Sequence, residues 1–243
     1  MPDPWTERMQ PHTPRANDYR TPFDLDFARV VHSEAFRRLS GVTQILSVQD
    51  SDFSRNRLTH TIEVSQVALG IVQSLTHTAA PTLASMLPTR ALMESVAAVH
   101  DIGHAPLGHG GEVALNYLLR DHGGFEGNGQ TLRILTKLMS SSTARNGGNL
   151  TRRTLLGALK YPVPWSKAIK APRYQNLYKD KHSPTTGRPL LVEEWYTPPK
   201  CYLDTETPVV NWLLSPLSDA ERAIVTSERI KSLDCARLGS CEQ

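Results

Sequence analysis

The sequence has 243 residues, with 27 lysines and arginines against 24 aspartates and glutamates and a formal net charge of +3. This length suits one medium-sized domain with a substantial hydrophobic core and is too short for two large domains. The charge is too close to balance to indicate a nucleic-acid-binding protein by itself, so any phosphate-binding face would have to be local.

The cysteine content and the N-terminal sequence indicate the cellular compartment. Cys201, Cys235 and Cys241 are odd in number and contain no CxxC pair, so they predict neither a disulfide framework nor a zinc site and fit a reducing cytoplasm. Residues 1–20 are polar and rich in proline, and we expect a flexible segment there. No apolar run approaches the roughly 20 residues that span a membrane. We therefore expect a soluble, cytoplasmic protein with no membrane partner.

Apolar residues recur at helical spacing along most of the chain, and strand signals are scarce. In chain order, helices are predicted at residues 24–39, 58–75, 87–100, 110–120, 125–139, 151–160, 208–214 and 218–233. Ser218 is a candidate N-cap for the last of these. From residue 161 to about 200 the composition shifts to Pro, Lys, Tyr and Trp without a sustained period, which predicts an irregular insert. The predicted fold is all-α.

Two of these helices carry histidines in notable positions. In the second helix, His60, Val64, Val67 and Ile71 are spaced by 4, 3 and 4 residues, so we expect them on one face turned toward the core. In the third, His100 lies at the C-terminal end, before glycine and proline interrupt the helix.

The stretch VHDIGHAPLGHGGE, residues 99–112, indicates a metal site. Adjacent helical side chains diverge by about 100°, so His100 and Asp101 can share a metal only at a helix end, which Gly103 provides. With His60 as a third ligand, the site would suit Mn, Fe, Zn or, less tightly, Mg. Alone, His60 would be interpreted as a satisfied core histidine, but the His-Asp pair favours the metal site.

The same stretch offers acid/base groups. His109 and Glu112 lie three residues apart and would share a helical face, as a base and its orienting carboxylate. The alternative is that Glu112 is an exposed first-turn glutamate that complements the helix dipole. His104 and His122 could stabilise charge on phosphate oxygens if they line the same cavity, and otherwise are surface or packing residues.

Three motifs in this order carry a family resemblance: RLTH at 57–60, HDIGHAPLGHGGE at 100–112 and DHGGFEGNGQTLRIL at 121–135. They closely resemble the HD-domain deoxynucleoside triphosphate triphosphohydrolases, in particular the bacterial dGTPase-like proteins. The likeness runs from about Arg20 to Lys160 and is weaker beyond. It implies an HD-domain helical bundle, a divalent metal (Mg, Mn or Fe), a homo-oligomer, and hydrolysis of a dNTP to a deoxynucleoside and inorganic triphosphate.

The resemblance also implies roles for individual residues. His60, His100 and Asp101 match three of the four metal ligands, and His109 and Glu112 match the acid/base pair. The residues implied to contact substrate are Arg57, His104 and His122 at the triphosphate and Gln44 at the sugar 3'-hydroxyl. A solvated helix-end arginine is the alternative for Arg57, and a side chain that faces water is the alternative for Gln44.

The sequence departs from the family near its end. The fourth metal ligand of the family is an aspartate in a stretch resembling Ala-Asp-Asp followed by a short apolar run and Tyr, and that stretch is absent. Asp234 lies nearby but lacks the accompanying residues. We therefore expect the HD-type domain, residues 21–243, to be incomplete at its C-terminal end. A three-ligand site would bind metal less tightly, so activity could be impaired.

Two other functions stay open at this stage. One is an HD phosphohydrolase for another phosphoester, which the HGGE extension argues against. The other is a catalytically weak nucleotide or single-stranded nucleic-acid binding protein that uses the basic, aromatic segment KAPRYQNLYKDK at 170–181. That segment could equally be a solvated flap.

Overall fold

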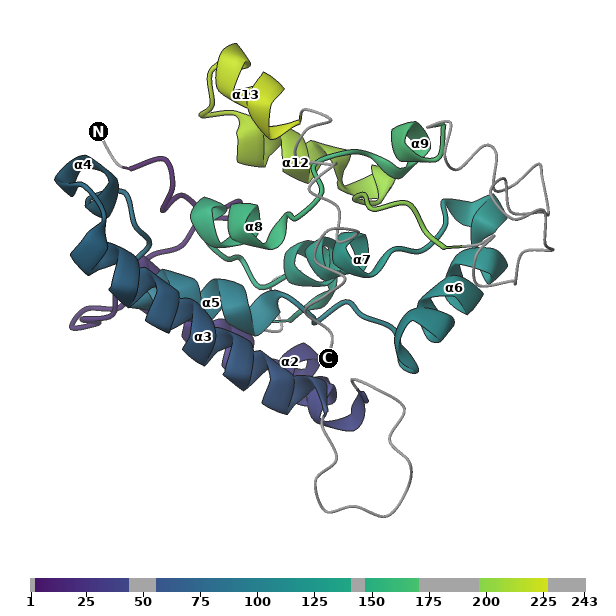
Figure 1. The fold of residues 1–243 in the computed structure, drawn as a ribbon, viewed down its shortest axis with the longest axis horizontal. Helices are drawn as coiled ribbons and strands as arrows, with labels where there is room; N and C mark the ends of the chain where they lie inside the picture. Colours follow the sequence, from purple (N-terminus) through teal and green to yellow (C-terminus); the bar gives the residue numbers. More distant parts are fainter. Residues whose placement is uncertain (1–2, 44–55, 141–146, 171–196, 227–243) are drawn as a thin grey trace.

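The computed structural model describes residues 3–43, 56–140, 147–170 and 197–226. These residues form helices joined by loops, with isolated β-bridges and no sheet among them (Figure 1). The all-α prediction is confirmed. No helix in the described ranges is long and apolar enough to cross a membrane.

The first predicted helix is split into two. α1 spans Pro22–Val31, α2 spans Glu34–Arg38, and the 3₁₀ turn η1 follows at Leu39–Gly41. The hydroxyl of Ser33 donates to the Val30 carbonyl at 2.6 Å and accepts from the Phe36 amide at 3.1 Å. Ser33 thus ends one helix and caps the next, so the prediction of one continuous helix at 24–39 is wrong.

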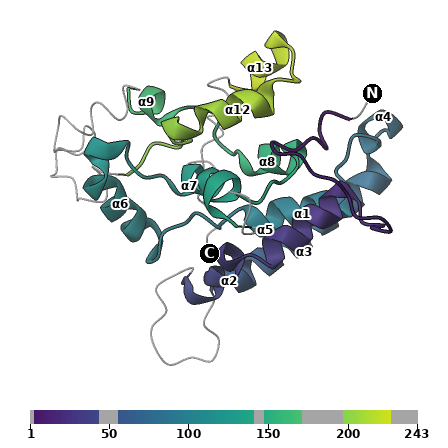
Figure 2. The same cartoon turned by 180° about the vertical axis from the view of Figure 1, so that it is seen from behind.

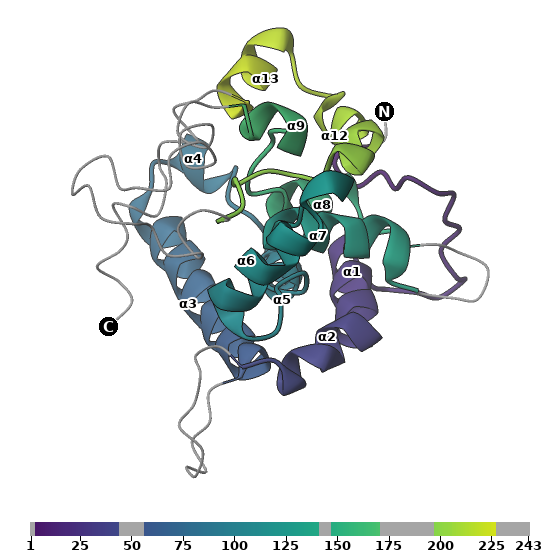
Figure 3. The same ribbon diagram turned by 90° about the vertical axis from the view of Figure 1, so that its right-hand side faces the viewer.

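α5 lies at the centre of the fold. It spans Arg90–Val99 and packs against α1 on one side and α3, Arg57–Thr78, on the other (Figure 3). Seen from behind, α1 runs along α5 (Figure 2). The short helix α4, Pro81–Ala84, connects α3 to α5. The end of α5 is therefore held between neighbours on both sides.

The exposed face of α3 differs from the prediction. Val67 is 56% exposed and Ile71 is 55% exposed, although they were expected to face the core together with His60. The buried residues of α3 are Arg57 and Thr61, four residues apart on one face. This polar face of the helix enters the protein, where the Arg57 side chain forms a buried ion pair with Asp101.

The middle of the chain forms α6, Gly108–Leu118, the turn η2, Arg120–His122, and α7, Gly127–Arg133. α7 continues as one π-helical turn, η3, Ile134–Leu138, so the helix predicted at 125–139 is shorter and less regular than expected. α6 lies at the opposite end of the molecule from α4 (Figure 1).

The last described elements complete the core. They are α8 at Arg152–Ala158, α9 at Trp165–Ala168, η4 at Asp204–Glu206, α12 at Thr207–Leu214 and α13 at Asp219–Val225. Ser218 caps α13 as predicted: its hydroxyl accepts from the Glu221 amide, and its own amide donates to the Glu221 carboxylate. α9 adds a short helix inside the predicted irregular insert, most of which lies outside the described residues.

The hydrophobic core joins residues from most of these helices. Its buried members are Val30, Leu39, Ala98, Val99, Ile102, Leu132, Leu135, Met139, Leu150, Leu155, Ala158, Tyr202, Val209, Val210, Leu213 and Leu214. The N-terminal segment contacts this body through ion pairs: Arg8 with buried Asp26 at 2.5 Å, and Glu7 with Arg152 at 2.8 Å.

Candidate metal centre

Three of the predicted site residues converge. His60 comes from the first turns of α3, and His100 and Asp101 come from the end of α5. One ligand atom from each lies within 4.8 Å of the others. The imidazole rings of His60 and His100 meet edge to face, with centroids 5.4 Å apart. The structure thus brings the predicted ligand set together around one point.

A glycine makes this convergence possible. His100 caps the C-terminus of α5, and the turn that follows lies against α7. The Gly103 amide donates to the Thr131 hydroxyl at 2.9 Å. A Cβ atom on Gly103 would lie 2.1 Å from the Thr131 backbone nitrogen and 2.4 Å from the Gly127 carbonyl oxygen. Only a residue without a side chain lets the turn approach α7 this closely.

The protonation of His100 supports metal binding. Its Nδ1 lies 2.7 Å from the Ala97 carbonyl oxygen, which can only accept a hydrogen bond, so Nδ1 carries the proton. Burial lowers the pKa of His100, which favours the neutral ring with a lone pair on Nε2. That Nε2 is buried, has no hydrogen-bond partner among the described residues, and lies 3.3 Å from Asp101 Oδ1.

Two lone-pair-bearing atoms at this separation repel each other unless a cation lies between them. A metal-ligating histidine ordinarily donates its other ring N–H to a carbonyl or carboxylate, as His100 donates to Ala97. An imidazole and carboxylate donor set suits a divalent transition metal. His60, His100 and Asp101 therefore fit a divalent metal ion.

Asp101 also has a positively charged neighbour. Arg57 Nη1 lies 2.6 Å from Asp101 Oδ2, and both side chains are buried. Burial by itself raises the pKa of Asp101, but the charge interactions around the carboxylate, that with the Arg57 guanidinium among them, outweigh burial, so the pKa lies below its ordinary value. The carboxylate is thus kept ionised, as a metal ligand must be. Arg57 Nε makes no hydrogen bond within the described parts of the chain.

His104 links the metal centre to a second cluster. Its Nδ1 lies 3.5 Å from Asp101 Oδ1, and its ring lies beside Gly127 at the start of α7. Burial lowers the pKa of His104 to about 4, although Asp101 opposes the shift. His104 is therefore a neutral group near pH 7.

His109 and Glu112 form the predicted pair. His109 Nδ1 lies 3.4 Å from Glu112 Oε2; the His109 side chain is 82% exposed and the Glu112 side chain 5%. Glu112 is therefore a buried carboxylate and not an exposed first-turn glutamate. Its Oε1 accepts from the Gly127 amide at 2.8 Å. Burial raises the pKa of Glu112, but the His109 contact, Lys200 and the Gly127 amide outweigh it and hold the pKa at about 2.

The turn before α6 sets the position of His109 and Glu112. Leu107 adopts the left-handed conformation, with φ of +64°, which is uncommon for a residue with a side chain. A Cβ atom on Gly111 would lie 1.9 Å from the Pro106 carbonyl oxygen. Position 111, just before Glu112, therefore requires glycine, because the first turn of the helix contacts the preceding loop there.

Two residues beside Glu112 were missed by the sequence analysis. Lys200 Nζ lies 3.3 Å from Glu126 Oε1 and 4.0 Å from Glu112 Oε2. Glu126 lies within the motif at 121–135 but was given no role. Lys200 stands alone after two prolines at the end of the insert, and nothing in its spacing indicates the site.

The remaining predicted substrate contacts are not joined to this cluster. His122 is exposed, and the described residues show no hydrogen bond or ion pair between it and the metal centre. Gln44 and Asp234 lie outside the described residues, as does most of the segment at 170–181. Their roles stay predictions.

The described residues form an all-helical protein with a partly buried His-His-Asp group that could hold a metal ion. No protein-family model matches the chain. Among curated proteins it is 48% identical over 224 residues to a deoxyguanosinetriphosphate triphosphohydrolase-like protein of Shewanella baltica, an alignment that covers 92% of this chain and 48% of that protein. Similarly named proteins of Shewanella sediminis and Aliivibrio fischeri are 44% and 43% identical, each over 96% of this chain and 53% of the relative.

The chain is thus a relative of the deoxyguanosinetriphosphate triphosphohydrolase-like proteins, and the resemblance predicted from the sequence motifs is confirmed. It spans about half the length of these curated relatives, 48–53% of each.

Proposed function

We propose that this protein is a metal-dependent phosphohydrolase of the HD type that cleaves deoxynucleoside triphosphates, with dGTP preferred, to deoxynucleoside and inorganic triphosphate. The observation that carries the proposal is the convergence of His60, His100 and Asp101 within 4.8 Å, next to buried Arg57 and the His109 and Glu112 pair. The printed names of the relatives support the substrate class.

His60, His100 and Asp101 would hold the metal. A divalent ion there supplies positive charge that polarises a phosphoryl oxygen. Arg57 adds a guanidinium that Asp101 already orients, 2.6 Å from one of the three candidate ligands. This concentration of positive charge suits the growing negative charge on a phosphorus centre under attack.

His109 would move the proton. Its Nδ1 faces Glu112, so Nε2 is the ring atom that takes a proton from the attacking water or gives one to the leaving deoxynucleoside oxygen. Glu112 orients the ring and stabilises its protonated form. The high exposure of His109 gives a substrate access to this ring.

The test is the identity of the products. The purified chain is incubated with each dNTP and Mn²⁺ or Mg²⁺, and the products are separated by ion-exchange chromatography. We expect deoxynucleoside and triphosphate in equal amounts, fastest from dGTP, with the activity lost in His100→Ala. His77→Ala, an exposed histidine on the same helix as His60, should keep it. Release of phosphate or pyrophosphate, or full activity of His100→Ala, would contradict the proposal.

A homo-oligomer, a cytoplasmic location and a fourth metal ligand stay predictions that the described residues do not test. The nucleic-acid alternative depends on the segment at 170–181, most of which lies outside the described residues, and no contact favours it over hydrolysis.

A further inference from the structure

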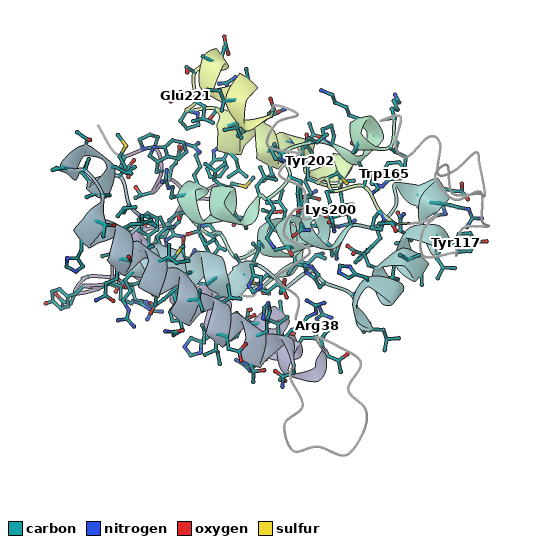
Figure 4. All side chains as sticks on the ribbon, in the orientation of Figure 1. Arg38, Tyr117, Trp165, Lys200, Tyr202 and Glu221 are labelled. Atoms are coloured by element: carbon teal, nitrogen blue, oxygen red, sulfur yellow. The ribbon has the colours of Figure 1, made fainter. Side chains whose placement is uncertain are left out.

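Lys200 occupies a position between two buried carboxylates. Its ammonium lies 3.3 Å from Glu126 Oε1 and 4.0 Å from Glu112 Oε2, and its side chain is 30% exposed. The residues that follow it are fixed against α7, because a Cβ atom on Gly129 would lie 3.1 Å from the Leu203 backbone nitrogen. Figure 4 places Lys200 beside α7, near the middle of the molecule.

The two carboxylates are anchored on the same turn of backbone. Glu112 Oε1 accepts from the Gly127 amide, while Glu126 Oε2 accepts from the Gly129 amide and Glu126 Oε1 from the Asn128 side chain. Neither carboxylate can move away without losing these hydrogen bonds.

The carboxylates therefore need a cation between them. Glu126 is fully buried, and burial raises its pKa, with Glu112 adding to the shift and Lys200 opposing it. Two buried carboxylates held close together both stay ionised only when a positive charge compensates them. Among the described residues, Lys200 is the cation in ion-pair contact with both.

We propose that Lys200 is a positioning residue that acts through Glu112: its ammonium balances the charge of Glu126 and so keeps the Glu112 carboxylate turned toward His109. This inference rests on the proposed function, in which His109 moves the proton. The groups that face Glu112 are His104, His109, Glu126 and Lys200, and Tyr161 also faces Lys200.

A charge-balancing role and direct binding of the substrate make different predictions for a pair of substitutions. Lys200→Met removes a positive charge near the His109 and Glu112 pair, so the proton affinity of the pair should rise. Glu126→Gln removes a negative charge, so the proton affinity should fall. When both are combined the two changes cancel. If Lys200 instead binds the triphosphate, Glu126→Gln would not rescue the loss caused by Lys200→Met.

The experiment compares Lys200→Met, Glu126→Gln and the double variant with the parent and with Lys167→Met, an exposed lysine on α9 that serves as the matched control. The readouts are the His109 ring titration by NMR, Mn²⁺ affinity, and the pH profile of triphosphate release. In Lys200→Met we expect the apparent pKa of the pair to rise and kcat to fall about 10-fold, with KM changed less than about twofold and Mn²⁺ affinity retained. The double variant should recover most of the parent's apparent pKa and most of its kcat.

A double variant as impaired as Lys200→Met, with the loss in KM, would overturn the inference and make Lys200 a substrate ligand. If Lys200→Met does not fold, Lys200→Arg should keep the parent titration and Glu126→Gln alone should still shift it downward; no shift in Glu126→Gln contradicts the proposal. The NMR titration also needs no turnover, so it decides the role of Lys200 even if the proposed reaction is not observed.

Discussion

Gly103 offers a severe test of how the candidate metal centre is built, because it lies two residues after Asp101 and touches α7. In Gly103→Ala the new Cβ would lie 2.1 Å from the Thr131 nitrogen, 2.4 Å from the Gly127 oxygen and 2.7 Å from the Gln130 carbonyl carbon. All three atoms are backbone, so the turn and the helix must separate. Overpacking of this kind costs about 1–3 kcal/mol, and weakening the 2.9 Å bond from Gly103 to Thr131 costs about 1 kcal/mol more.

We therefore expect Gly103→Ala to lower the free energy of unfolding by about 2–4 kcal/mol and to weaken Mn²⁺ binding. The assay is urea denaturation followed by circular dichroism, with Gly70→Ala as the matched control. Gly70 lies within α3, and a Cβ there meets no atom within 4 Å, so alanine should raise the stability by about 0.5–1 kcal/mol. If both variants are equally stable, the close approach of the turn to α7 is not what holds Asp101.

Two further predictions concern buried charges. Without metal, Arg57→Met should lower the free energy of unfolding by about 3–5 kcal/mol, because it leaves Asp101 as an uncompensated buried charge. Mn²⁺ should restore part of this loss. Thermal denaturation with and without Mn²⁺ measures the effect, and equal losses under both conditions would contradict the prediction. Because the pKa of Glu112 falls from 4.5 to about 2 in the fold, it contributes about 3 kcal/mol above pH 4.5 that is lost as the pH falls toward 2. Urea unfolding at pH 6 and pH 3 should show this acid-dependent loss in the parent and a smaller one in Glu112→Gln, and an identical pH dependence would argue against the ionised, buried Glu112.

The sequence predicted the extents of α3 and α5 well, because apolar residues recur at helical spacing in both. Burial of one face explains this pattern in α5, whereas Val67 and Ile71 of the α3 pattern are exposed. The prediction was wrong where a polar side chain sets a helix boundary or lies on the buried face of a helix. Ser33 divides the first predicted helix with two hydrogen bonds, and α3 buries the polar face that carries Arg57 while Val67 and Ile71 are exposed.

The clustering of the three candidate metal ligands was the most predictable part of the site. A helix-end histidine followed by aspartate and a nearby glycine lets both side chains turn toward one point, and the structure brings His60, His100 and Asp101 together. Lys200 and Glu126 could not be predicted in the same way. Their meeting depends on how the chain returns after the insert to pack on α7, and no local pattern records that path.

Metal binding tests the central claim most directly. Mn²⁺ is titrated into the purified chain and the free ion is followed by electron paramagnetic resonance. We expect saturable binding at one ion per chain, lost or strongly weakened in His60→Ala, His100→Ala and Asp101→Asn, and unchanged in His77→Ala, which alters an exposed histidine on α3. Binding that is the same in all four variants would show that these three side chains do not form a metal site.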